Sequence, residues 1–136
     1  MYTPELVLDG AEVRRGALDA LKGGVQSASP IIELEVRTTG DAIDVKTRVS
    51  GAAAGSKVYL ALSEDGLSVD VARGENAGKT LRHEAVVRAL LGPLPLGGAA
   101  QRITLPSSAY GKLNIVAFVE AASSTAIVQA VSAPVR

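Results

Sequence analysis

The segment Gly74–Thr80, GENAGKT, has the residue types of a phosphate-binding loop, with a glycine followed by a Gly-Lys-Thr end. That signature needs four residues between its first glycine and the Gly-Lys pair. Here three residues separate Gly74 from Gly78, and one of them, Glu75, would repel a phosphate. We therefore interpret the segment as a structured turn between two strands, in which the glycines permit positive φ.

His83 is the only histidine and could act as a general base or a metal ligand. No second histidine and no cysteine accompany it, so the usual zinc ligand sets are missing. The serine pairs also lack the G-x-S-x-G context of a nucleophile elbow. We predict that the protein is not an enzyme and needs no cofactor or metal. A small hydrolase or nucleotide-binding protein using GENAGKT and His83 is the less favoured alternative.

Polar side chains gather around the same segment, and we treat them as a candidate recognition surface. Hydrogen bonds satisfied within a turn would explain the same residues, so this reading competes with a structural one. The candidate surface consists of Arg73, Glu75, Asn76, His83 and Arg88.

The composition limits the classes of partner. Acidic and basic residues balance at 14 each, which gives no electrostatic reason to expect nucleic acid. The chain has few aromatic residues for base stacking, and no apolar run long enough to span a membrane. The N-terminus shows no signal-peptide pattern. The 47% hydrophobic content favours a folded domain with a real core.

The first 29 residues differ in pattern from the rest. Glu5–Asp9 and Glu12–Arg14 are predicted as two short strands around an Asp-Gly turn, and Ala17–Lys22 suits a short helix. Such a strand–turn–strand–helix unit is too small to be stable alone. We expect residues 1–29 to pack on the remainder or to contact a partner protein or a second copy of the chain.

After Pro30 the apolar residues alternate with polar ones, which is typical of half-buried strands. The charges select a register for the first hairpin, in which Val36 lies opposite Val45. That register makes three cross-strand pairs attractive, namely Glu33 with Arg48, Glu35 with Lys46 and Arg37 with Asp44.

The later segments predict further strands. Val58–Leu62 and Leu67–Val71 are expected to form a hairpin around a turn at 63–66, and Leu81–Leu91 is ambiguous between helix and strand, with strand favoured. Residues 92–98 are expected to be irregular because of their prolines and glycines. A strand at Gln101–Leu105 and a last hairpin, placed centrally, complete the set; this hairpin pairs Lys112–Glu120 with Thr125–Ser132. We predict a mainly β fold: an antiparallel sandwich over residues 30–136, immunoglobulin-like in style, with about seven strands.

Three segments resemble a known family. YTPELVLDG resembles the part of thioredoxin-like folds where a Thr-Pro bond is cis, here Thr3-Pro4. ARGENAGKTLRHEAVVRAL and LNIVAFVEAASSTAIVQAV are similar to later parts of bacterial secreted proteins of unknown function, the domain-of-unknown-function family twelve-twenty-three. The resemblance implies a secreted or periplasmic protein, in which residues 1–29 are the remnant of a thioredoxin-like domain and residues 30–136 an appended sandwich.

One departure bears on function. The family carries a Cys-x-x-Cys motif upstream of the Thr-Pro strand, and this chain contains no cysteine. We therefore expect a non-catalytic accessory or interaction domain. A truncated redox protein, whose cysteines lie upstream of this chain, is the alternative that the resemblance implies.

Overall fold

The computed structural model describes residues 7–8, 10–12, 29–108 and 111–136, and within these residues the chain is mainly β with no helix. Accordingly, none of them forms a helix long and apolar enough to cross a membrane. The strands in chain order are β1 (Val7–Leu8), β2 (Ala11–Glu12), β3 (Ile31–Thr39), β4 (Ala42–Ser50), β5 (Lys57–Asp65), β6 (Leu67–Asp70), β7 (Thr80–His83), β8 (Val86–Leu94), β9 (Ala99–Thr104), β10 (Lys112–Glu120) and β11 (Ile127–Pro134).

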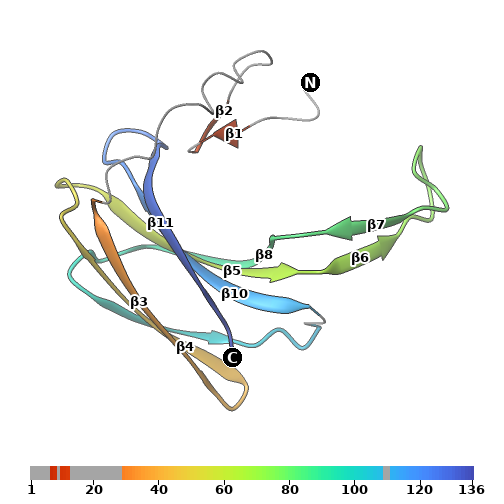
Figure 1. Cartoon of the computed structure of the whole chain (residues 1–136), viewed down its shortest axis with the longest axis horizontal. Helices are drawn as coiled ribbons and strands as arrows, with labels where there is room; N and C mark the ends of the chain where they lie inside the picture. The colour runs from red at the N-terminus through yellow and green to blue at the C-terminus, as the bar shows by residue number, and fades with distance from the viewer. Residues whose placement is uncertain (1–6, 9, 13–28, 109–110) are drawn as a thin grey trace.

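The described strands form four antiparallel sheets (Figure 1). The larger two are a four-stranded sheet in the order β11-β10-β5-β8 and a three-stranded sheet in the order β3-β4-β9. Pairs β1-β2 and β6-β7 are separate two-stranded ribbons. The β6-β7 ribbon projects away from the end of β5 and β8 (Figure 1), and we call it the arm.

One hydrophobic core joins the two larger sheets. One face of each strand in these sheets turns toward the core, because successive side chains point to opposite faces of a strand. Its buried members are Ile32, Ile43, Val45, Val49, Val58, Leu60, Leu62, Ile103, Ile115, Ala117 and Val119. The edge strand β11 also contacts β3 (Figure 1), and the side-chain amide of Gln129 donates a 3.1 Å hydrogen bond to the Pro30 carbonyl.

The predicted first hairpin is confirmed in its register. Val36 lies opposite Val45, and all three predicted charge pairs are cross-strand neighbours. The ion pairs differ from the prediction, because Arg37 contacts Glu35 of its own strand while Asp44 contacts Arg102 of β9. Strand β9, on the other side of β4, therefore supplies Arg102 as the partner of Asp44 in place of Arg37.

The predicted hairpin of Val58–Leu62 with Leu67–Val71 is wrong. β5 continues through Ser63, Glu64 and Asp65 and takes β10 and β8 as its two neighbours. Because both edges of β5 are occupied, β6 pairs with β7 instead. The residues predicted as a turn at 63–65 are thus the end of a central strand.

The preference for strand at Leu81–Leu91 is confirmed, with a break. β7 ends at His83 and β8 begins at Val86. Between them Ala85 has a φ of 53°, and its N–H donates to the Asp65 carboxylate at 2.8 Å. This left-handed residue re-aims the chain from the arm into the four-stranded sheet, so the two halves do not share one continuous face.

Two other predictions need correction. Residues 92–94 are not irregular but belong to β8, which tolerates Pro93 because β8 is an edge strand and the missing N–H costs no ladder bond. In the last hairpin β10 is central as predicted, whereas β11 lies at the edge of its sheet. The strand expected at Gln101–Leu105 is confirmed as β9, and nine strands follow Pro30 instead of about seven.

The predicted N-terminal strand pair is present as β1 and β2, joined through Gly10. A Cβ on Gly10 would lie 2.1 Å from the Thr125 carbonyl oxygen, so this turn sits directly against the β10–β11 connection. The predicted helix at Ala17–Lys22 and the Thr3-Pro4 bond lie outside the described residues.

Candidate functional site

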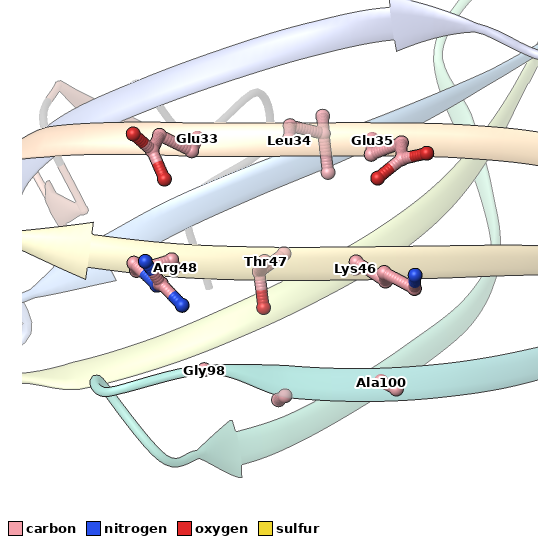
Figure 2. Close-up of a pocket in the computed structure, with 9 residues that line it drawn as sticks. Glu33, Leu34, Glu35, Lys46, Thr47, Arg48, Gly98 and Ala100 are labelled. Atoms are coloured by element: carbon pink, nitrogen blue, oxygen red, sulfur yellow. The ribbon is translucent and has the colours of Figure 1, made fainter.

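An open groove of about 610 Å³ crosses the outer surface of the β3-β4-β9 sheet (Figure 2). Its acidic side is formed by Glu33 and Glu35 of β3, and its basic side by Lys46 and Arg48 of β4. Small residues at 98–100 leave room beside β4 on the third side. Since each acidic residue lies opposite a basic one, the groove presents both signs of charge and no strong net field.

Thr47 lies beneath the groove, because it shares the core-facing side of β4 with Val45 and Val49, and it is 4% exposed. Its Oγ1 is the only buried side-chain oxygen or nitrogen of the described residues that lacks a hydrogen-bond partner. In the register its neighbours are Leu34 and Ala99, which offer no polar side-chain atom. Burying a hydroxyl without a partner is unfavourable.

We predict that Thr47→Val raises the free energy of unfolding by about 1 kcal/mol, because it removes the unsatisfied hydroxyl and keeps the branched shape. Urea unfolding of the purified chain measures this change. A loss of stability instead would show that the buried hydroxyl has a hydrogen-bond partner in solution, and would contradict the prediction.

The surface pair beside the groove has a clear electrostatic signature. Arg102 Nε and Nη2 donate to the two carboxylate oxygens of Asp44 at 2.7 and 2.9 Å. These hydrogen bonds lower the pKa of Asp44 from its ordinary value of 3.8 to about 2, and the same contact raises the pKa of Arg102. Both groups are solvent-exposed, so we assign the pair a structural role in joining β4 to β9.

We predict that Arg102→Gln returns the pKa of Asp44 towards 3.8. Because the folded pKa is depressed, the stabilisation is present above the ordinary pKa and is lost as the pH falls towards about 2. NMR titration of the Asp44 carboxyl group in both proteins measures the shift. An unchanged pKa in the variant would contradict the assignment to Arg102.

A second polar cluster lies where the arm leaves the four-stranded sheet. Glu64 is fully buried and forms an ion pair with Arg88 of β8. Its other oxygen accepts a hydrogen bond from the Gly111 N–H at 2.8 Å. Arg88 Nη2 also donates to Ser108 Oγ at 2.7 Å. The cluster thus ties β5 and β8 to the segment that precedes β10.

Two neighbouring carboxylates, those of Asp65 and Glu84, also accept hydrogen bonds at this junction. Asp65 accepts from the N–H of Ala85 and from the side-chain amide of Asn114, and Glu84 accepts from the N–H of Gly66 at 2.9 Å. These contacts hold the junction between sheet and arm. The described residues contain no group of three or more histidine and acidic side chains placed to hold a metal ion.

The structure spreads the predicted recognition residues over three places. Arg73, Glu75 and Asn76 are exposed in the turn at the tip of the arm, and His83 is exposed at the arm's base, where it pairs with Leu67. Arg88 lies beyond the break, engaged with Glu64. The tip residues are therefore adjacent to one another, and Arg88 is committed to the junction.

The GENAGKT segment forms the turn between β6 and β7, as predicted, and Gly74 and Gly78 have φ of 92° and 82°. Its amides are used within the turn. The N–H groups of Ala77, Gly78 and Lys79 donate to the carbonyls of Gly74, Val71 and Asn76, respectively. A phosphate cradle requires such N–H groups to point at the anion.

Comparison with known families gives one match. The model of the family described as "Protein of unknown function (DUF1223)" matches residues 1–120. The chain belongs to the DUF1223 family. No curated protein and no solved structure matches it. In this DUF1223 chain the match covers the three-stranded sheet, the arm and strands β5, β8 and β10 of the four-stranded sheet, and it stops at the end of β10, before β11.

The same DUF1223 chain has one surface that the sequence reasoning did not identify. On the four-stranded sheet the residues facing away from the core form cross-strand rows, with Phe118 opposite Tyr59, and Val116 and Leu90 on either side of Ala61. The Tyr59 and Phe118 rings stack at 5.4 Å. Leu90 is 62% exposed and Val87 is 59% exposed. We call this surface the apolar face, made of Tyr59, Ala61, Val87, Leu90, Val116 and Phe118.

A sequence signal for the apolar face existed. The segment Lys112–Glu120 is apolar on both faces near its middle, which predicts either burial in the centre of a fold or an apolar outer surface. The structure places one face of β10 in the core and gives the other to the apolar face.

Proposed function

We propose that this protein is a non-catalytic interaction domain, an antiparallel β-sandwich of immunoglobulin-like style that binds a protein partner through the apolar face. The contrast between the two outer surfaces supports this. The middle of the β3-β4-β9 outer surface presents the charged side chains of Glu33, Glu35, Lys46 and Arg48, whereas the middle of the β11-β10-β5-β8 outer surface presents aromatic and aliphatic ones, of which Val87 and Leu90 are the most exposed. A half-buried sheet normally alternates apolar-in with polar-out, so an apolar outer row needs a partner surface.

The residue types on the apolar face suit protein recognition. The cores of protein interfaces are enriched in aromatic residues and depleted of charged ones. The stacked pair of Tyr59 and Phe118 supplies rigid apolar area at little cost in side-chain entropy. Leu90 and Val87 lie beside this pair on the edge strand β8, where both side chains are accessible to a partner.

The resemblance of the sequence to secreted thioredoxin-like proteins supports placing this domain outside the cytoplasm, beside a thioredoxin-like module. In that setting we propose that the domain positions a partner and leaves exchange chemistry to other residues. The chain itself contains no cysteine to perform it.

Photo-crosslinking in cells of the source organism tests the proposed function. A photoreactive amino acid at position 90 is expected to yield a specific higher-mass species. The same group at position 31 is the matched control, because Ile31 is 60% exposed but lies on β3, in the other large sheet. If position 90 yields no adduct, or the two positions yield the same ones, the apolar face is not a recognition surface.

A further inference from the structure

The rim of the apolar face carries a charge pattern that bears on the identity of its partner. At one end of the sheet Glu120 lies opposite Lys57, and at the other end Lys112 lies opposite Asp65. By the alternation of β5 and β10 these four side chains share the outer surface with Tyr59 and Phe118. The surface thus has an apolar centre, the polar pair of Ser63 and Asn114 beside it, and one acidic and one basic residue at each end.

That pattern is self-complementary. In a twofold-symmetric contact each patch meets an identical patch of the second copy. The patch must therefore be complementary to itself in shape and charge. Each rim end here offers both signs of charge, and an end of one copy can face either end of another with opposite charges in reach. The formal net charge of the whole chain is zero, so two copies approach without long-range repulsion.

The available area is sufficient for a dimer. The whole outer surface of the four-stranded sheet, with β11 and the charged ends included, measures about 30 Å by about 19 Å, or about 570 Å² per copy. The apolar face itself lies on three of these strands, so a dimer of this size needs β11 and the charged ends in the contact as well. Two copies would then bury about 1,100 Å² in total, above the roughly 1,000 Å² that a specific interface needs.

We propose that the apolar face binds the apolar face of a second copy of this chain, forming a twofold-symmetric, face-to-face dimer. This inference rests on the proposed function and names its partner. It differs from an association through residues 1–29, because the contact lies on the central strands β5 and β10 and the edge strand β8. Leu90, the most exposed large apolar residue described, then lies in the contact.

Sedimentation velocity of the purified chain tests the dimer, with a concentration series up to about 100 μM. The wild-type protein is expected to sediment with twice the 13.9 kDa mass of one chain. Leu90→Lys is expected to reduce the mass to that of one chain over the whole series. Val87→Lys, made separately, repeats the test at a second position, and circular dichroism confirms that each variant is folded.

Ile31→Lys is the matched control, since it places the same charge at a similarly exposed aliphatic residue away from the apolar face. It is expected to leave the dimer intact. A monomeric wild-type protein, a dimer that survives both Leu90→Lys and Val87→Lys, or equal dissociation by Ile31→Lys would overturn the dimer. A position-90 crosslink to a different protein in cells would then leave the proposed function standing with another partner.

Discussion

Replacing Arg88 with methionine is expected to lower the free energy of unfolding by about 3–5 kcal/mol, because it removes the Arg88 guanidinium from a buried carboxylate. Glu64 is 0% exposed, and the Arg88 guanidinium reaches it from the neighbouring strand. The Gly111 N–H still donates to Glu64 in the variant, but a neutral hydrogen-bond donor does not replace the positive charge of Arg88. Urea unfolding followed by circular dichroism gives the difference.

Arg102→Met is the matched control for this prediction. It removes an arginine from another arginine–carboxylate pair, but the Arg102 and Asp44 side chains are 64% and 37% exposed. Exposed pairs contribute about 1 kcal/mol or less. Adding Glu64→Gln to the Arg88→Met protein should recover part of the loss, since a neutral amide is easier to bury than a carboxylate. Equal losses in Arg88→Met and Arg102→Met would contradict the structural role of the buried pair.

The same experiment separates two interpretations of Arg88. A side chain that served partner recognition alone could be replaced with little effect on the stability of the isolated domain. The contacts of Arg88 with Glu64 and Ser108 instead place it at the junction between the four-stranded sheet and the arm.

Leu60→Ala is expected to destabilise the domain by about 2–5 kcal/mol, because Leu60 is completely buried between the two larger sheets. Leu90→Ala removes the same atoms from the other face of the same sheet, where Leu90 is 62% exposed. Its effect on the free energy of unfolding should stay within about 0.5 kcal/mol. The free energies of unfolding of both variants should be measured at a protein concentration where the chain is monomeric.

This comparison tests whether one face of the four-stranded sheet is buried in the core while the other is exposed in the single chain. If Leu90→Ala costs as much as Leu60→Ala in the monomer, Leu90 belongs to a second core, and the apolar face is covered within the chain itself.

The sequence predicted those features that local pattern controls. The register of β3 with β4 followed from alternating aliphatic residues and from the opposite charges of Glu33 with Arg48 and of Glu35 with Lys46. The β6–β7 turn followed from Gly74 and Gly78, which adopt the positive φ that glycine permits. Both features depend on residues close together in the chain.

The failures involve partners far apart in the chain. No local signal indicates that β5 takes β8 and β10 as neighbours, so Leu67–Val71 was placed beside the wrong strand. The pairing of Glu64 with Arg88 depends on that arrangement, since the two residues are separated by 24 positions and meet only when β8 lies beside β5. The predicted recognition set included Arg88 because sequence proximity to GENAGKT cannot reveal a buried partner.

The apolar face was missed for a different physical reason. Apolar residues on both faces of a strand are expected wherever both faces are buried, whether by the protein's own core or by another molecule. The sequence of β10 is consistent with either case, and only the arrangement of layers shows that Val116 and Phe118 face away from the core.

The central claim is that a second copy of the chain covers the apolar face and shields it from solvent. Methyl NMR of the purified chain at high concentration, with a soluble paramagnetic probe added, tests it most directly. We predict that the methyl signals of Leu90 and Val87 are protected from broadening while those of Ile31 are strongly broadened. Equal broadening of Leu90 and Ile31, which are similarly exposed in the single chain, would contradict the claim.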